Sequence, residues 1–298
     1  MKSACLGAAL AFSGVVASGC VVNVDTQAEI VREEKRFPVA GVPELHLTTF
    51  DGAIEIHSWD RPEVVVEIEK RGPTREAVDA LEVGTAQKGQ RVEVEVKRPR
   101  SERLSGVGFY HTPTAKLIVS VPRAANVVAR SGDGSIHIER VDGRIELRTG
   151  DGSVRATEIS GDVLIHTGDG SVTINDADGR LNIDTGDGGV TVNGRLRGLR
   201  IRTGDGSITY RAEPESRMDE DWDLSTGDGS VTVYLPKSFN AVLDAHTGDG
   251  SIRNELQIEG SQGDRGGERR RTLRGRLGEG GRSLRIRTGD GTIRLRAS

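Results

Sequence analysis

The chain has 298 residues, a formal net charge of -4 and an aromatic content of only 3%. This mild charge excludes the extended basic surface on which nucleic-acid binding depends, so we expect no nucleic-acid partner. Forty glycines and a hydrophobic content of 35% fit a turn-rich β protein with a narrow interior.

Residues 1–19 are typical of a secretory signal peptide, with Lys2, an apolar run over 4–16 and a small-residue end. Cys20 follows directly, and this arrangement resembles the lipobox of bacterial lipoproteins. The resemblance implies cleavage after Gly19, lipidation of Cys20 and a membrane as partner. The resemblance also implies secretion across the inner membrane and lipid anchoring at the cell envelope. Because Val21 and not Asp follows Cys20, it implies sorting to the outer membrane if the organism has one. An ordinary signal peptide with an incidental cysteine is the alternative.

Cysteine usage limits the chemistry of the mature protein. Cys5 lies inside the predicted signal peptide, so Cys20 is the only cysteine that remains after cleavage. Disulfides and cysteine-based metal sites are therefore excluded, and stability has to come from packing and backbone pairing.

The region before the repeats is less regular. Residues 20–36 are polar and charged without a clear period, and we expect a tether. Between 37 and 130, alternating apolar residues predict strands near 45–47, 53–56, 64–68, 92–96 and 117–121, with a short helix within 73–83. Residues 49–54 resemble a degenerate first copy of the repeat that follows.

From residue 131 the motif Thr/Ser-Gly-Asp-Gly-Ser/Thr recurs seven times, and an eighth copy at 185–189 ends in Gly. The first five motifs are 18 residues apart, and a fixed period of this size indicates a repeat architecture. Each repeat also holds two short strands with apolar residues two apart. The Asp residues of the eight copies are Asp133, Asp151, Asp169, Asp187, Asp205, Asp228, Asp249 and Asp290.

Two all-β folds are compatible with this pattern. In a parallel β-solenoid with 18-residue two-strand repeats, successive copies stack about 4.8 Å apart and like residues lie on like. In an antiparallel β-meander the same strands form hairpins, and equivalent residues lie two strands apart. The near identity of whole turns favours a solenoid over residues 37–298, because direct stacking forces every corner into the same conformation.

Insertions disturb the period toward the C-terminus, where the spacing lengthens to 23, 21 and 41 residues. The largest insertion, near 257–282, is rich in Arg and Gly, and the chain ends just after one more half-coil. We expect this insertion to fold back over an open end of the solenoid. Arg294 and Arg296 would then act as charged residues that keep the end strand from pairing with another molecule.

Two stretches share one arrangement, in which a strand ends in Pro, an Asn-containing strand start follows, and a motif comes next. They contain Val119-Ser120-Val121-Pro122 with Ala125-Asn126-Val127, and Val233-Tyr234-Leu235-Pro236 with Asn240-Ala241-Val242. This arrangement resembles the putative-adhesin family of bacterial envelope proteins, over roughly residues 37–298. The resemblance implies a right-handed parallel β-helix and brings no catalytic residues.

The repeated turn has a structural and a chemical interpretation. As a corner, it would use glycine for positive φ angles and Asp to hydrogen-bond its own downstream backbone in an Asx-turn. As a surface ladder, the eight Asp carboxylates would repel one another, and Ca²⁺ could relieve that repulsion. Comparison with the calcium-binding β-roll repeat places Val172 where that motif needs Asp, so we predict no cofactor and keep calcium as an alternative. The histidines are scattered and predict no metal site: His46, His57, His111, His137, His166 and His246.

Catalytic motifs are missing from the sequence, which has no P-loop, no Gly-x-Ser-x-Gly and no His-Glu-x-x-His. We therefore predict a non-enzymatic cell-envelope lipoprotein that acts as an adhesin or as a surface binding or scaffold protein. Its ligand would be a protein or a polysaccharide. The alternatives are a polysaccharide-active β-helix enzyme and an envelope-stress or signalling component.

Overall fold

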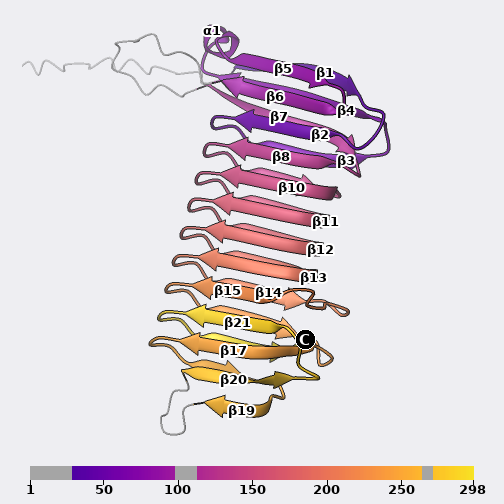
Figure 1. The fold of residues 1–298 in the computed structure, drawn as a ribbon. Coiled ribbons are helices and arrows are strands. Elements are labelled where there is room, and N and C mark those ends of the chain that lie inside the picture. Colours follow the sequence, from indigo (N-terminus) through magenta and orange to yellow (C-terminus); the bar gives the residue numbers. More distant parts are fainter. Residues whose placement is uncertain (1–28, 98–112, 264–270) are drawn as a thin grey trace, which may run out of the picture.

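The computed structural model describes residues 29–97, 113–263 and 271–298, which form an elongated stack of β-strands (Figure 1). These residues contain 22 strands and one short helix, α1 (Arg75–Asp79), so the protein is all-β. Successive repeats pair as parallel strands in a register of 18 residues, for example Val154 with Val172 and Val172 with Val190. The parallel solenoid is therefore confirmed, and the antiparallel meander is wrong.

Each turn of the solenoid, called a rung below, contributes to two faces of the stack. The first face holds the strands that lead into the Gly-Asp-Gly turns, and the second face holds the strands that leave them. Strands β11 (Val154–Thr167), β12 (Val172–Thr185) and β13 (Val190–Thr203) each start on the second face, bend at the opposite corner and end on the first face.

The remaining strands follow this division. In their order along the stack, the first face contains β5 (Glu82–Lys88), β6 (Arg91–Lys97), β2 (Glu44–Thr49), β8 (Asn126–Ser131), β10 (Asp142–Thr149), then β11 to β13, β15 (Trp222–Thr226), β21 (Ser283–Thr288), β17 (Ala241–Thr247), β20 (Thr272–Leu277) and β19 (Glu259–Gly263). The second face contains β1 (Glu29–Pro38), β4 (Glu63–Gly72), β7 (Thr114–Pro122), β3 (Ile54–Trp59), β9 (Ile136–Glu139), then β11 to β13, β14 (Ile208–Ala212), β16 (Val231–Leu235), β22 (Ile293–Ala297) and β18 (Ile252–Asn254).

The core runs along the axis of the stack between the two faces. Burial alternates along each strand, so that Val172 and Ile174 are fully buried while Thr173 between them faces outward. Toward the C-terminal end the interior is filled by aromatic rings. The ring centroid of Trp222 lies 5.5 Å from that of Tyr210, in an edge-to-face arrangement, and 5.3 Å from that of Phe239. A single apolar column therefore supports all the rungs, and both faces depend on it.

The corner opposite the Gly-Asp-Gly turn also repeats. Its glycines have left-handed φ angles of 153°, 109° and 129°, at Gly143, Gly161 and Gly179 respectively. Three residues before each glycine, a second residue has a left-handed φ of 56°, 51° or 55°, at Arg140, Glu158 and Asp176. Positive φ angles are therefore concentrated at this corner, where glycine adopts them at no steric cost.

The expected tether at 20–36 is too long. Strand β1 pairs antiparallel with β4 along its whole length, so residues 29–36 belong to the folded stack. Lys70 Nζ donates to Glu33 Oε1 at 2.6 Å, which joins the two strands and lowers the pKa of the Glu33 carboxyl. Sequence periodicity missed this strand because β1 lies at the edge of the sheet and most of its side chains stay in solvent.

At the N-terminal end the rungs do not follow chain order. Strand β2 pairs with both β6 and β8, and β3 pairs with both β7 and β9, so the β2–β3 rung lies between two rungs that come later in the sequence. Thr49 pairs in register with Ser131, which confirms residues 49–54 as a degenerate first copy. The antiparallel strands β5 and β4 cover this end.

The C-terminal rung is also out of order, which corrects our expectation for this end. Strand β21 lies between β15 and β17, and β22 lies between β16 and β18; Figure 1 shows yellow β21 between two orange strands. The last complete rung is therefore β17–β18 and not the chain terminus. Arg294 cannot guard an open edge, because β16 and β18 pair with its strand on both sides.

The insertion near 257–282 does cover an end of the stack, but it covers the β17–β18 rung. Its described residues include β19 and β20, and β20 pairs antiparallel with β17. Asp244 of β17 joins this cap to the inserted rung, since its oxygens accept from Arg274 Nε at 3.0 Å and from Arg287 Nη2 at 2.9 Å. Burial raises the pKa of the Asp244 carboxyl, but the arginines outweigh burial and hold the pKa below its usual value.

Engineered cysteine pairs test the rung order at this end. Thr232 pairs in register with Arg294, whereas Arg253 lies on the other side of β22. Neighbouring strands are about 4.8 Å apart, within the Cα range of a disulfide, and strands two apart are well outside it. We expect a Thr232→Cys, Arg294→Cys variant to form a disulfide on mild oxidation, detected by mass spectrometry of unreduced peptides. A disulfide in the Thr232→Cys, Arg253→Cys variant, with none in the first, would contradict this order.

Candidate functional site

The repeated turn is built around a buried threonine. The first residue of the motif points into the turn, and in eight rungs it is a threonine that is at most 7% exposed: Thr49, Thr149, Thr167, Thr185, Thr203, Thr226, Thr247 and Thr288. Thr167 shows the pattern: its hydroxyl lies 3.0 and 3.2 Å from the carbonyl oxygens of Gly150 and Gly152 in the preceding turn, and it accepts from Gly170 N at 3.2 Å. The hydroxyl thus connects each turn to its neighbour and closes its own turn.

The motif glycines are required because neighbouring turns stack closely. Our prediction that these glycines adopt positive φ angles is wrong. Among the described residues, no glycine of the eight motifs is in the left-handed region. A Cβ on Gly170 would lie 2.0 Å from the carbonyl oxygen of Gly152, and a Cβ on Gly168 would lie 2.9 Å from that of Gly150. Both positions therefore lack room for any side chain.

The eight predicted ladder residues all lie on the outer edge of the turns and are exposed. Along the stack the order of the last two is reversed, so that Asp290 precedes Asp249, because the C-terminal rung is inserted. No hydrogen bond to the downstream backbone is made by these eight carboxylates in the described structure, so the expected Asx-turn is wrong. Asp249 pairs with Arg271 at 3.4 Å. Calcium binding at this ladder stays the untested alternative to our prediction of no cofactor.

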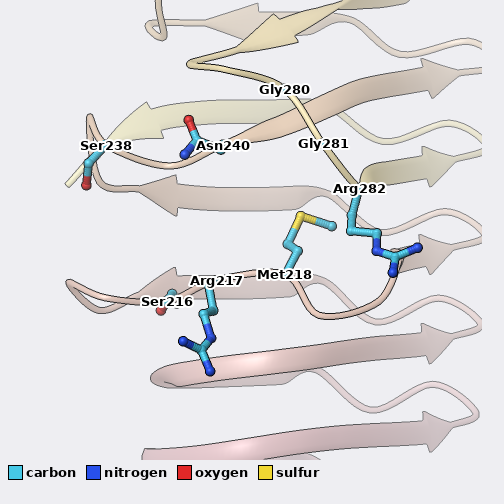
Figure 2. Close-up of a pocket in the computed structure, with 8 residues that line it drawn as sticks. All are labelled: Ser216, Arg217, Met218, Ser238, Asn240, Gly280, Gly281 and Arg282. Carbon is cyan, nitrogen blue, oxygen red and sulfur yellow. The ribbon is translucent and has the colours of Figure 1, made fainter.

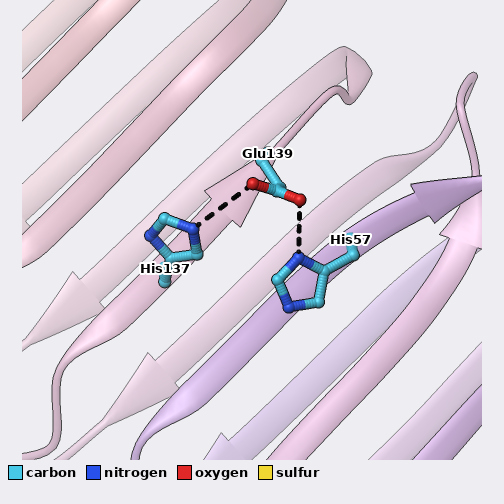
Figure 3. Close-up of side chains that lie close together, drawn as sticks. All are labelled: His57, His137 and Glu139. Atoms are coloured by element: carbon cyan, nitrogen blue, oxygen red, sulfur yellow. Dashed lines mark ion pairs between the residues drawn. The ribbon is translucent and has the colours of Figure 1, made fainter.

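A histidine cluster on the second face was missed by the sequence analysis. Figure 3 shows the Glu139 carboxylate between the imidazoles of His57 and His137. His57 Nδ1 lies 3.0 Å from Glu139 Oε1, and His137 Nε2 lies 3.7 Å from Glu139 Oε2. The hydrogen bond with His57, with further help from Arg140, lowers the pKa of the Glu139 carboxyl against the opposing effect of burial. Within the described ranges this is the one group of three His, Cys, Asp or Glu residues with ligand atoms within 4.8 Å of one another.

One signal in the sequence points to this cluster. If residue 49 is aligned with residue 131 as the start of a repeat, His57 and Glu139 occupy the same repeat position, and His137 lies two residues earlier on the same side of its strand. The structure pairs His57 with Glu139 in register. The sequence analysis missed this cluster because it considered the histidines along the chain and did not place them on neighbouring rungs.

A shallow trough of about 600 Å³ crosses the first face over β10 to β13. Its polar walls contain arginines and acids: Arg144, Arg180, Arg200, Glu146, Asp162, Glu220 and Asp221. Arg180 pairs with Asp162 at 3.4 Å and with Glu220 at 3.7 Å. Arg144 and Arg200 form no ion pair with any described residue, although Asp162 and Asp223 are their register neighbours. Two guanidinium groups without a direct carboxylate partner therefore border the trough.

A second hollow, of about 460 Å³, lies near the C-terminal end of the stack at the corner away from the Gly-Asp-Gly turns (Figure 2). The loops before β15, β17 and β21 line it, with Met218, Asn240 and Arg282 among their residues. In Figure 2 the guanidinium groups of Arg217 and Arg282 point away from each other. These two guanidinium groups therefore do not converge on one point of the hollow.

The predicted lipid-attachment residue Cys20 and the predicted signal peptide at 1–19 lie outside the described residues. The same is true of His111 and of part of the Arg-rich insertion, at 264–270. Within the part of the chain that is described, no helix has the length and apolar character to cross a membrane.

The in-register stack of rungs, with a buried threonine and close-packed glycines at each turn, defines a β-solenoid repeat protein. The family model of Toastrack DUF4097 matches residues 42–296, so the chain belongs to the Toastrack DUF4097 family. No curated protein matches the chain.

Several solved structures are similar to the chain at low sequence identity. One is described as a putative adhesin from Parabacteroides distasonis, with 12% identity and a TM-score of 0.47, covering 89% of this chain and 97% of that chain. Another is a putative adhesin from Parabacteroides merdae, with 11% identity and a TM-score of 0.42, covering 89% and 95%. A third is a putative adhesin from Bacteroides fragilis, with 12% identity and a TM-score of 0.36, covering 90% and 97%.

Proposed function

We propose that the protein is a non-enzymatic, lipid-anchored binding protein of the bacterial cell envelope, which holds its ligand against a strand face as an adhesin or scaffold does. The observation that carries this proposal is the polar trough on the first face, which crosses β10 to β13 and is bordered by two unpaired arginines. A rigid stack keeps these side chains at constant spacing, because each rung is fixed by the rungs on both sides.

The trough lining contains three arginines and four acids, and its two arginines without ion pairs are the groups that an extended acidic ligand would contact. The strands of Arg144 and Arg200 are three apart, about 14 Å, and Arg200 is also offset from Arg144 by two residues along the strand direction, since it is in register with Glu146. A polymer that carries a carboxylate on successive units can contact both guanidinium groups at once, whereas a small anion contacts only one. An acidic polysaccharide has this chemistry, and arginine binds carboxylates with two parallel hydrogen bonds.

The acids of the trough are poorly suited to glycoside hydrolysis. That reaction needs a carboxylic acid whose pKa is raised, so that it can protonate the leaving group, and a second carboxylate opposite it. Burial raises the pKa of Glu146, but hydrogen bonds and charges from Arg130 and Arg148 outweigh burial and lower it. Asp162 and Glu220 both pair with Arg180. The arrangement supports binding without turnover.

Attachment to the envelope is supported by the lipobox-like end of the signal segment, in which Cys20 follows Ala17, Ser18 and Gly19. Acyl chains on Cys20 would hold the protein at a membrane, since stable anchoring needs more than one chain. The tether between Cys20 and β1 would then be short, because β1 begins at Glu29. With such an anchor, the N-terminal end of the stack, with β1, β4 and β5, would face the membrane.

Binding is tested with the full chain, purified in detergent, over immobilised alginate and over neutral dextran, by surface plasmon resonance. We expect salt-sensitive binding to alginate, and a Kd at least about tenfold higher for an Arg144→Glu, Arg200→Glu variant. The control is Arg155→Glu, an exposed arginine on the second face, which should bind as the unaltered protein does. Equal binding to dextran, or no effect of the double substitution, would reject the proposed ligand surface.

Anchoring is tested separately by expressing the full chain and its Cys20→Ala variant in a Gram-negative host. The unaltered chain should incorporate labelled palmitate and sediment with the outer membrane, and the variant should do neither. Membrane sedimentation of the variant at the level of the unaltered chain would show that Cys20 is not the anchor.

A further inference from the structure

We propose that His57, His137 and Glu139 form a binding site for a divalent metal ion of the kind that prefers imidazole ligands, with Zn²⁺ as its representative. The three side chains come from β3 and β9, neighbouring strands of the second face, and all point outward on the same side (Figure 3). This site is distinct from the Asp ladder and from the trough on the first face.

The spacing of the ligand atoms fits a metal centre. Zinc binds histidine nitrogen at about 2.0–2.1 Å and carboxylate oxygen at about 2.0–2.2 Å, so two ligands of a tetrahedral zinc lie about 3.3 Å apart. The two nitrogen–oxygen separations in the cluster are 3.0 Å, from His57 to Glu139 Oε1, and 3.7 Å, from His137 to Glu139 Oε2, so each histidine faces a different oxygen of the carboxylate. The remaining pair, one nitrogen from each histidine, lies within 4.8 Å. To bind one ion, the two imidazoles and the carboxylate would turn toward a common point between them.

The ligand types select the metal. Two imidazole nitrogens and one carboxylate oxygen suit zinc, copper and nickel, whereas calcium and magnesium take oxygen ligands. The three side chains are 26–34% exposed, so water can reach the ion and complete its coordination. Three protein ligands with an open fourth position would also let the bound ion accept a donor group from another molecule.

The surrounding charges set the strength of the site. Arg140 donates to Glu139 Oε1 at 2.9 Å, which fixes the carboxylate and leaves Oε2 facing His137. On β3, Glu55 is in register with His137, but Lys116 neutralises Glu55 at 2.8 Å. Arg155 of β11 is the register neighbour of His137 on the other side. Because Arg140 and Arg155 repel a cation, we expect micromolar and not nanomolar affinity.

A bound ion would join two rungs that are distant in sequence. His57 belongs to the β2–β3 rung, which enters the stack out of chain order, and Glu139 belongs to the β8–β9 rung. The ion would therefore hold the β2–β3 rung against the β8–β9 rung. Because only the folded stack brings the ligands together, binding should raise the midpoint of thermal unfolding by at least about 5 °C at a hundredfold excess over Kd.

The site is tested by isothermal titration calorimetry with ZnCl₂, using the full chain without a histidine tag and with Cys5 and Cys20 alkylated. We expect one ion per chain, and binding at least about tenfold weaker for His57→Gln and for His137→Gln. The matched control is His46→Gln, since His46 lies 2.7 Å from Glu44 on the first face but has no second histidine beside it. That variant should bind zinc as the unaltered chain does.

Thermal unfolding completes the test and guards against misfolded variants. Without metal, His57→Gln and His137→Gln should unfold near the midpoint of the unaltered chain, and ZnCl₂ should raise only the midpoints of the unaltered chain and of His46→Gln. Any effect of calcium chloride on the unfolding midpoint should be the same in all four proteins, because calcium prefers oxygen ligands to imidazole. The proposal is overturned if zinc fails to bind, or if it binds His57→Gln and His137→Gln as tightly as the unaltered chain.

Discussion

The contact between one Gly-Asp-Gly turn and the next constrains the rest of the stack. At each turn the backbone carbonyl of one rung lies where a side chain of the next rung would be, as between Gly152 and Gly170. The buried hydroxyl of Thr167 joins the two turns, because it lies within hydrogen-bond distance of the carbonyl oxygens of Gly150 and Gly152 in the preceding turn. Because this contact allows only one register, it aligns the strands on both sides of the turn and with them the inward apolar columns.

The same constraint explains why rungs need not follow chain order. Every rung presents the same kind of turn and inward apolar columns, so a rung can stack on one that is not its neighbour in the sequence. At the C-terminal end β21–β22 fills a gap between two earlier rungs, and at the N-terminal end β6 and β7 stack outside the earlier β2–β3 rung. At the N-terminal end β1 is the outermost strand of the second face, whereas at the C-terminal end β22 lies inside the stack. On the first face the antiparallel strands β5 and β20 cover β6 and β17.

The period of 18 residues was sufficient to predict the solenoid, because stacking is local and repeats in every copy. It was insufficient for the rung order, since equivalent copies are interchangeable partners and the period does not choose among them. The histidine cluster depends on that choice: His57 meets Glu139 only because β3 lies beside β9. Strand β1 was missed because edge strands lack the apolar alternation on which prediction relies. The motif glycines were recognised in the sequence, but the reason why glycine is needed there was not. That reason is the carbonyl oxygen of the neighbouring turn, which a single repeat does not contain.

Two glycine substitutions test the turn contact most directly, by urea unfolding of the full chain. Gly170→Ala places a Cβ 2.0 Å from the Gly152 carbonyl oxygen, whereas the last residue of the eighth motif, Gly189, has its nearest contact at an ordinary 3.7 Å. We predict that Gly170→Ala lowers the free energy of unfolding by about 2–3 kcal/mol or more, and that Gly189→Ser changes it by less than about 0.5 kcal/mol. A Gly170→Ala variant as stable as the unaltered chain would contradict the central role of the stacked turns.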